Sequence, residues 1–214
     1  MPETNRSRVL NDVEIKLLWE ALDLENKAID IFWVTKLVLK MIFCTGQRSG
    51  EICGITWDEI DFDKAVWILP ASRVKNSQEH RLPLTDTAQG IIKQARELFG
   101  DESPFVFRSP CREGPIQPHS CSRAVLRHHK EMGIEDPFTP HDIRRTVRTR
   151  LAELKVDEFI AERVLGHKLQ GMLAVYNQYD YLPEKRKALE LWERRLNAIA
   201  GIPQPASNVI PFAR

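Results

Sequence analysis

The sequence predicts a mainly α-helical domain that carries a small three-stranded antiparallel β-sheet. Apolar residues recur at helical spacing over most of the 214 residues. Only residues 55–84 change to an alternating pattern rich in β-branched and aromatic side chains, which is typical of strands. Hydrophobic residues make up 43% and charged residues 29% of the chain, and these ordinary values exclude a disordered or fibrous protein.

The N-terminal region predicts two helices. Asn11 is the expected N-cap of the first, over residues 13–22, and Asp30 is the expected cap of the second. Residues 31–44 are apolar nearly all round, so we expect them to form the central buried helix. This run is too short to cross a bilayer and no longer apolar run occurs, so we expect a cytoplasmic protein with no membrane partner.

The alternating region predicts the sheet. Gly46 breaks the central helix, and a short helix around Glu51 comes before the first strand. The residues that indicate strands are Ile55, Trp57, Ile60, Val66, Trp67 and Ile68. A third strand is expected over residues 80–84, where Pro83 indicates a sheet edge because proline cannot donate a ladder hydrogen bond.

Helical spacing resumes after the sheet, and a loop containing proline and glycine interrupts it. The expected helices cover residues 85–99, 119–132, 140–154, 157–165 and 183–200, and the loop covers 100–118. We therefore predict one domain over residues 1–200. Residues 201–214, with three prolines, form a separate tail.

Composition alone does not indicate a DNA-binding protein. Thirty-one Lys and Arg against thirty Asp and Glu give a net charge of +1, whereas nucleic-acid binders are usually more basic. Residues 119–150 differ, because they hold seven Lys or Arg, four Asp or Glu and four His, and could form a local positive face. The four cysteines include no CxxC pair, which argues against a zinc site or a disulfide framework.

Five short segments carry residues suited to phosphate chemistry. They are TGQRSGE (45–51), RVKNSQEHRLPL (73–84), HDIRRT (141–146), LGH (165–167) and YNQYDYL (176–182). In this order and approximate spacing they resemble the tyrosine recombinase, or phage integrase, family over nearly the whole chain. The resemblance implies the catalytic-domain fold of that family. It also implies a site-specific recombinase that cuts and rejoins DNA through a 3′-phosphotyrosine and uses neither a metal nor ATP.

Two arginines are the expected phosphate-binding cations. Arg48 and Arg144 suit this task because a guanidinium keeps its charge and its planar fork can bind phosphate bidentately. The resemblance gives Glu51, three residues after Arg48, a supporting role. His141 falls in the first turn of its predicted helix, and its i, i+3 spacing lets it reach the same phosphate as Arg144.

The helix over residues 140–154 should bury one stripe and expose another. Thr139 is its expected N-cap. The core stripe is expected to be Ile143, Val147, Leu151 and Leu154, and the exposed side is expected to be His141, Arg144, Arg145 and Arg148. Arg145 and Arg148, together with Arg73, are candidates for contacts to the DNA backbone. A charged face that only meets solvent is the alternative for these arginines.

The resemblance points to Lys75, in the turn before the third strand, as the general acid for the leaving 5′ oxygen. Lys64, in the preceding turn, is its local competitor. His167 follows Gly166, which should end a helix in the left-handed conformation. The helix residues that should pack in the core are Phe159, Ile160, Val164 and Leu165. His167 could then bond the scissile phosphate or position the nucleophile.

A tyrosine is the expected nucleophile. The chain has just three tyrosines, all within residues 176–181, and the spacing from the LGH segment selects Tyr176. Tyr179, about one helical turn away, is the main alternative, and Tyr181 is expected to pack. A phenol with a pKa of about 10 needs neighbouring cations or a base before it can attack at neutral pH.

The resemblance also implies partners. Double-stranded DNA with attachment sites is the expected substrate, and several protomers, as a tetramer, would assemble on it, with a monomer possible without DNA. The tail over residues 201–214 is expected to be mobile or exchanged between protomers. We find no N-terminal DNA-clamping domain before residue 11 and expect it to be missing from this chain. The protein would act at the bacterial nucleoid.

Three other protein classes remain open. A type IB topoisomerase shares the chemistry, and a non-catalytic DNA-binding regulator could share the fold. A metal-dependent nuclease would need clustered Asp, Glu and His side chains, whereas His141 and Asp142 form a lone pair.

Overall fold

The structure is a computed structural model, and it describes residues 8–74, 78–100, 102–167 and 179–203. Its helices are α1 Asp12–Ala21, α2 Trp33–Thr45, α3 Ser49–Cys53, α4 Asp86–Phe99, α5 Pro118–His128, α6 Pro140–Glu153, α7 Glu158–Val164 and α9 Leu182–Ala200. The strands are β1 Ile60–Asp61, β2 Val66–Leu69 and β3 His80–Pro83. The predicted fold class, mainly α with a small antiparallel sheet of three strands, is confirmed.

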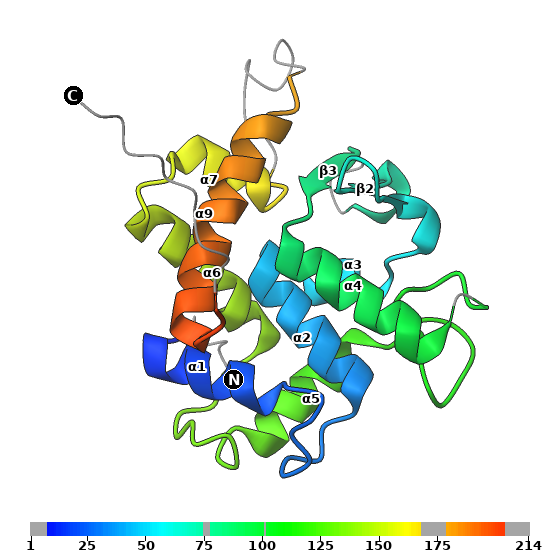
Figure 1. Cartoon of the computed structure of the whole chain (residues 1–214), viewed down its shortest axis with the longest axis vertical. Helices are drawn as coiled ribbons and strands as arrows, with labels where there is room; N and C mark the ends of the chain where they lie inside the picture. Colours follow the sequence, from blue (N-terminus) through cyan, green and yellow to red (C-terminus); the bar gives the residue numbers. More distant parts are fainter. Residues whose placement is uncertain (1–7, 75–77, 101, 168–178, 204–214) are drawn as a thin grey trace, which may run out of the picture.

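Helix α2 forms the centre of the core. Eleven of its thirteen residues are buried, and it contacts α3, α4, α5, α6 and α9. Figure 1 shows it between α4 on one side and α6 and α9 on the other. Buried Lys36 is satisfied, because its Nζ donates to the carbonyls of Asp23 at 2.9 Å and Asn26 at 2.6 Å. The predicted central buried helix is therefore confirmed.

The helix starts follow capping chemistry at two of three predicted positions. Asn11 caps α1 by accepting from the backbone N–H of Glu14 at 3.0 Å, as predicted. Thr139 caps α6 in the same way through Asp142, also as predicted. The prediction for Asp30 is wrong, because the cap residue of α2 is Phe32, whose side chain makes no cap bond.

Local packing explains where α2 begins. Ile29 and Ile31 are both buried, and the backbone N–H of Ile31 donates to the carbonyl of Ile29 at 2.8 Å. This tight turn places both side chains in the core, so the helix begins only after it. A polar residue between two core residues is therefore not enough to predict a cap.

The three strands pair in the order β1-β2-β3, and every pairing is antiparallel. Strand β3 lies at an edge, which Pro83 predicted. Trp57 was expected in a strand but lies in a short 3₁₀ turn, Trp57–Glu59. Its backbone N–H donates to the carbonyl of Pro104 at 3.0 Å, so this segment pairs with a distant loop instead of with the sheet.

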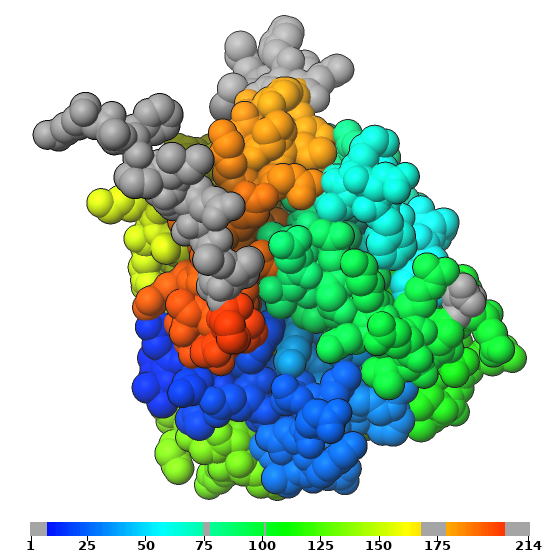
Figure 2. Space-filling view, in the orientation of Figure 1, coloured from blue at the N-terminus to red at the C-terminus, as the bar shows by residue number. Residues whose placement is uncertain are grey.

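Helix α9 joins distant parts of the fold. It packs on α1, α2, α6, α7 and β3, and Figure 2 shows it, orange to red, reaching down to α1 in blue. Trp192 is fully buried, and its Nε1 donates to the carbonyl of Phe43 at 2.7 Å. Lys185, also buried, donates from Nζ to the carbonyl of Arg81 in β3. Within the described ranges, no helix has both the length and the apolar character that crossing a bilayer requires.

Candidate active site

Two helix ends meet at the guanidinium of Arg144, which comes from α6. Its Nη1 donates to the carbonyl of Gly46 at 2.7 Å, and its Nη2 donates to the carbonyl of Leu165 at 2.8 Å. Gly46 ends α2 and Leu165 ends α7, so one side chain of α6 holds both ends. The expectation that Arg144 is exposed is wrong: only 4% of it is exposed. Helix-terminal carbonyls need donors, and a guanidinium that supplies them can be buried.

Close packing also holds the end of α2 against α6 and α7. Gly46 has a φ of +66°, a conformation that favours glycine. A Cβ at this position would lie 2.9 Å from Leu165 Cδ2 and 3.2 Å from Val147 Cγ1. Two features therefore require glycine at position 46. One is its left-handed backbone conformation, and the other is the close approach of α6 and α7.

His167 lies beside Arg144. Gly166 has a φ of +69°, so the prediction that it ends the helix in the left-handed conformation is confirmed. The chain then turns so that His167 Nε2 is 3.0 Å from Arg144 Nη2. Ile160 is partly buried and packs against the core as predicted, whereas Phe159 is partly buried and packs on Tyr181.

Arg48 and Glu51 form the second cationic group of the site. Glu51 accepts from Arg48 Nη1 at 2.9 Å and from the backbone N–H of Arg48 at 3.0 Å. The carboxylate is nearly buried at 8% exposure, whereas the Arg48 side chain is 35% exposed. Glu51 therefore holds Arg48 at the start of α3 and leaves part of its guanidinium open to solvent.

Electrostatic coupling shows that these groups share one region. Burial and the nearby Arg48 cation lower the pKa of Arg144 to about 10, so it remains charged at neutral pH. Burial, together with the cations of Arg145, Arg144 and Arg48, lowers the pKa of His141. The structure thus brings Arg48, His141, Arg144 and His167 together, as the four candidate phosphate-binding side chains require.

The three candidate DNA-backbone arginines are all paired inside the protein. Arg145 Nη1 donates to Asp142 at 2.5 Å, and Arg148 Nε donates to Glu162 at 2.6 Å. Arg73 donates to Glu59 and, at 2.8 Å, to the carbonyl of Glu51. Direct contacts of these arginines to DNA stay a prediction.

Lys75 and Tyr176 lie outside the described residues, so their roles stay predictions. Residues 74 and 78, on either side of the Lys75 segment, line the same small cleft as His167. Lys64, the competitor of Lys75, forms an ion pair with Asp61 at 2.9 Å in the turn between β1 and β2.

Tyr181 makes a packing contact, whereas Tyr179 is 51% exposed. Tyr179 Oη lies 3.3 Å from a carboxylate oxygen of Glu184. Desolvation and this carboxylate raise the pKa of Tyr179, which makes its phenol a weaker nucleophile. Tyr181 packs edge-on against Phe159, with their ring centres 4.9 Å apart.

Three residues near the site were not predicted. Gln47 donates from Nε2 to the carbonyls of Thr45 at 3.0 Å and Val164 at 2.7 Å, and so links the end of α2 to the end of α7. His80 lies beneath Gly166; burial and the cation of Lys185 lower its pKa to about 3. Glu162 pairs with both Arg148 and His167. Gln47 and His80 had a sequence signal, because they stand inside the TGQRSGE and RVKNSQEHRLPL segments, whereas Glu162 lies outside all five segments.

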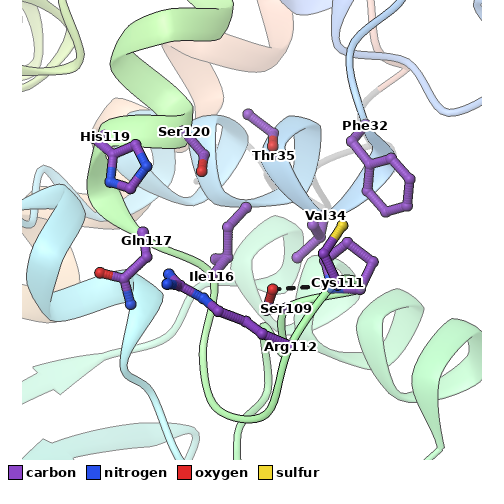
Figure 3. A pocket seen from close by; sticks show the side chains of 11 residues that line it. Phe32, Val34, Thr35, Ser109, Cys111, Arg112, Ile116, Gln117, His119 and Ser120 are labelled. Atoms are coloured by element: carbon purple, nitrogen blue, oxygen red, sulfur yellow. Dashed lines mark hydrogen bonds between the residues drawn. The ribbon is translucent and has the colours of Figure 1, made fainter.

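A separate groove of about 430 Å³ lies between the start of α2 and the loop before α5. In Figure 3 the Arg112 side chain extends toward Gln117 on one side, and Phe32 and Cys111 lie on the other. None of the four clustered site residues lines it. Over the described part of the chain, no group of three or more His, Cys, Asp or Glu side chains is placed to hold a metal ion.

The fold is shared with solved structures of integrases. It matches the integrase from mycobacterium phage Brujita with a TM-score of 0.66 at 18% identity, covering 95% of this chain and 66% of that one. It matches the lambda integrase catalytic core with a TM-score of 0.59 at 22% identity, covering 78% of this chain and 95% of that one. The described residues therefore have the fold of an integrase catalytic domain.

The sequence defines the family. The model of the phage integrase family matches residues 8–182, and the chain belongs to this family. Prophage integrase IntA of Escherichia coli strain K12 is 31% identical over 159 residues, which cover 74% of this chain and 38% of that protein. The chain spans half or less of the length of the curated relatives that it matches first.

Proposed function

We propose that this chain is the catalytic domain of a site-specific DNA recombinase of the phage or prophage integrase type. The observation that carries the proposal is the grouping of Arg48, His141, Arg144 and His167 where α2 and α7 end beside α6. Cations and hydrogen-bond donors held in this way stabilise the charge that develops on a phosphate in its transition state. Family membership and fold agree with this proposal.

The proposed reaction is a pair of transesterifications. Tyr176 gives up its phenolic proton to solvent as its oxygen attacks the scissile phosphorus, and a phosphotyrosine bond forms at the 3′ side. The bond from phosphorus to the 5′ oxygen breaks, and that oxygen takes a proton from Lys75, which solvent then protonates again. Arg48 and Arg144 bind the non-bridging oxygens. The 5′-hydroxyl of a partner strand then attacks the phosphotyrosine, which rejoins DNA and releases Tyr176. Because the ester conserves the bond energy, the scheme needs neither ATP nor a metal.

The proposed substrate is double-stranded DNA that contains attachment sites, and the proposed place of action is the bacterial nucleoid. One solved structure of lambda integrase is a tetramer bound to a Holliday junction, and for this protein we propose a tetramer on DNA and a monomer without it. We also propose that full activity needs a DNA-clamping domain in addition to these residues. Arg73, Arg145 and Arg148 are the proposed backbone contacts within this chain.

A covalent adduct is the direct test of the proposal. The protein, with a DNA-clamping domain added if necessary, is incubated with an attachment-site duplex that carries a nick near the cleavage position. We expect an adduct that survives denaturant and still forms with EDTA present. DNA binding without any adduct would instead support a non-catalytic regulator. Relaxed plasmid without recombinant products would support a topoisomerase.

The tail over residues 201–214 is proposed to exchange between neighbouring protomers. Only its first three residues, 201–203, are described, so the proposal rests on its composition and its position after α9. A protein truncated after Ala200 should form the adduct on one site but pair two sites weakly. Gel-shift and sedimentation measurements with two-site DNA test this, and unchanged pairing would contradict it.

A further inference from the structure

Glu162 contacts two side chains that surround the site. One carboxylate oxygen, Oε1, accepts from Arg148 Nε at 2.6 Å, and the other, Oε2, pairs with His167 Nδ1. Burial opposes the charge of this carboxylate, but the hydrogen bonds from His167 and Arg148 outweigh burial and lower the pKa of Glu162. Glu162 is therefore a carboxylate at neutral pH, and a carboxylate can only accept hydrogen bonds.

The other ring nitrogen of His167 faces a group that can only donate. Arg144 Nη2 lies 3.0 Å from His167 Nε2, and a guanidinium has no acceptor. Nε2 must therefore accept and cannot carry a proton in this arrangement. Nδ1 must donate, because its partner is the Glu162 carboxylate. Both neighbours thus require the same neutral tautomer, with the proton on Nδ1.

We infer that Glu162 is a positioning residue for strand cleavage, which fixes the tautomer and the ring orientation of His167, and that Arg148 holds its carboxylate in place. The hydrogen-bond geometry around His167 stands without the proposed function. Only the statement that this geometry serves strand cleavage rests on the proposed function. It gives Arg148 a role inside the protein, in addition to the proposed contact with DNA.

The arrangement matters when a phosphate arrives. A phosphate oxygen bound by Arg144 takes the place of the contact between Arg144 and His167 and meets Nε2. Nε2 is then the ring nitrogen that faces the phosphate, while Nδ1–H stays on Glu162. Once a phosphate has displaced the Arg144 contact, Glu162 is the described partner that still fixes which ring nitrogen faces the phosphate.

The same helix offers a matched control. Glu158, one helical turn before Glu162, lies 3.3 Å from Arg148 Nη2, and its side chain is 87% exposed. It therefore shares the ion pair with Arg148 but is not a partner of His167 in the described contacts. Glu158→Gln removes a comparable charge from α7 and leaves the His167 contact in place.

The first measurement is the tautomer of His167 in the DNA-free protein, by two-bond ¹H–¹⁵N correlation of its imidazole. We expect one tautomer, with the proton on Nδ1, in the parent protein and in Glu158→Gln. Glu162→Gln keeps the shape but offers Nδ1 an amide that can donate as well as accept, so only the Arg144 contact still favours the Nδ1–H form and an Nε2–H population should appear beside it. A His167 that stays wholly in the Nδ1–H form in this variant would show that Arg144 alone sets the tautomer and would overturn the inference.

The second measurement is the single-turnover rate of adduct formation on the nicked duplex. Glu162→Gln should lower it about tenfold or more at unchanged DNA affinity, whereas Glu158→Gln should change it by no more than about twofold. A Glu162→Gln rate equal to the parent rate would also overturn the inference. A parent protein that forms no adduct would count against the proposed function instead, while the tautomer measurement would still decide the role of Glu162.

Discussion

Tyr176→Phe should abolish the covalent adduct and leave DNA binding intact. The substitution removes one oxygen atom, the proposed attacking atom, and keeps the ring. Losing a nucleophile costs more than about a thousandfold in enzymes that form covalent intermediates. The measurement is adduct formation on the nicked attachment-site duplex, with the affinity for the intact duplex measured in parallel. Peptide mapping of the parent adduct should place the DNA on Tyr176.

The two other tyrosines provide the controls. Tyr179→Phe removes a phenol that faces Glu184 and whose pKa is already raised, and Tyr181→Phe removes one that packs on Phe159. Both variants should keep adduct formation near the parent level. If Tyr179→Phe abolishes the adduct and Tyr176→Phe does not, the nucleophile is Tyr179 and the assignment by spacing from the LGH segment is wrong.

The elements of this fold could be predicted where one segment carries enough information by itself. Residues 31–44 are apolar nearly all round, so a central buried helix removes most of their side chains from water. The pattern around Thr139 specifies a helix start because the cap and its partner lie three residues apart. The start of α2 could not be predicted from Asp30, because tertiary burial of Ile29 and Ile31 decides it.

The candidate site also has features that could be predicted from the sequence and features that could not. The segments around Arg48, Arg144 and His167 could be found from the sequence, but the burial of Arg144 could not. Helical spacing separates the faces of one helix, whereas the acceptors that allow Arg144 to be buried are carbonyls 98 and 21 residues away. Glu162 was missed for a related reason. It reaches His167 only because the chain turns at Gly166, and no periodic pattern includes a contact across a helix end.

Arg144→Lys should disable the site and also weaken the fold. Three of the five guanidinium N–H groups are used in the contacts to Gly46, Leu165 and His167, which keeps the ends of α2 and α7 beside α6. A lysine keeps the charge, but its single nitrogen cannot reproduce this planar fork. At least one buried carbonyl loses its donor, which costs about 1–3 kcal/mol of unfolding free energy. Urea unfolding measures this loss.

Arg144→Lys should lower the rate of adduct formation by more than its loss of stability explains. An arginine that stabilises charge on a transferring phosphoryl group contributes about 10³-fold or more to the rate. We therefore expect Arg144→Lys to lower single-turnover adduct formation by about that factor under conditions where the variant is fully folded. Arg150→Lys, on the same helix, is the matched control, because Arg150 pairs with Asp12 and Glu153 away from the site. A folded Arg144→Lys protein that forms the adduct as fast as the Arg150→Lys protein would show that the phosphate is not bound at the meeting point of α2, α6 and α7.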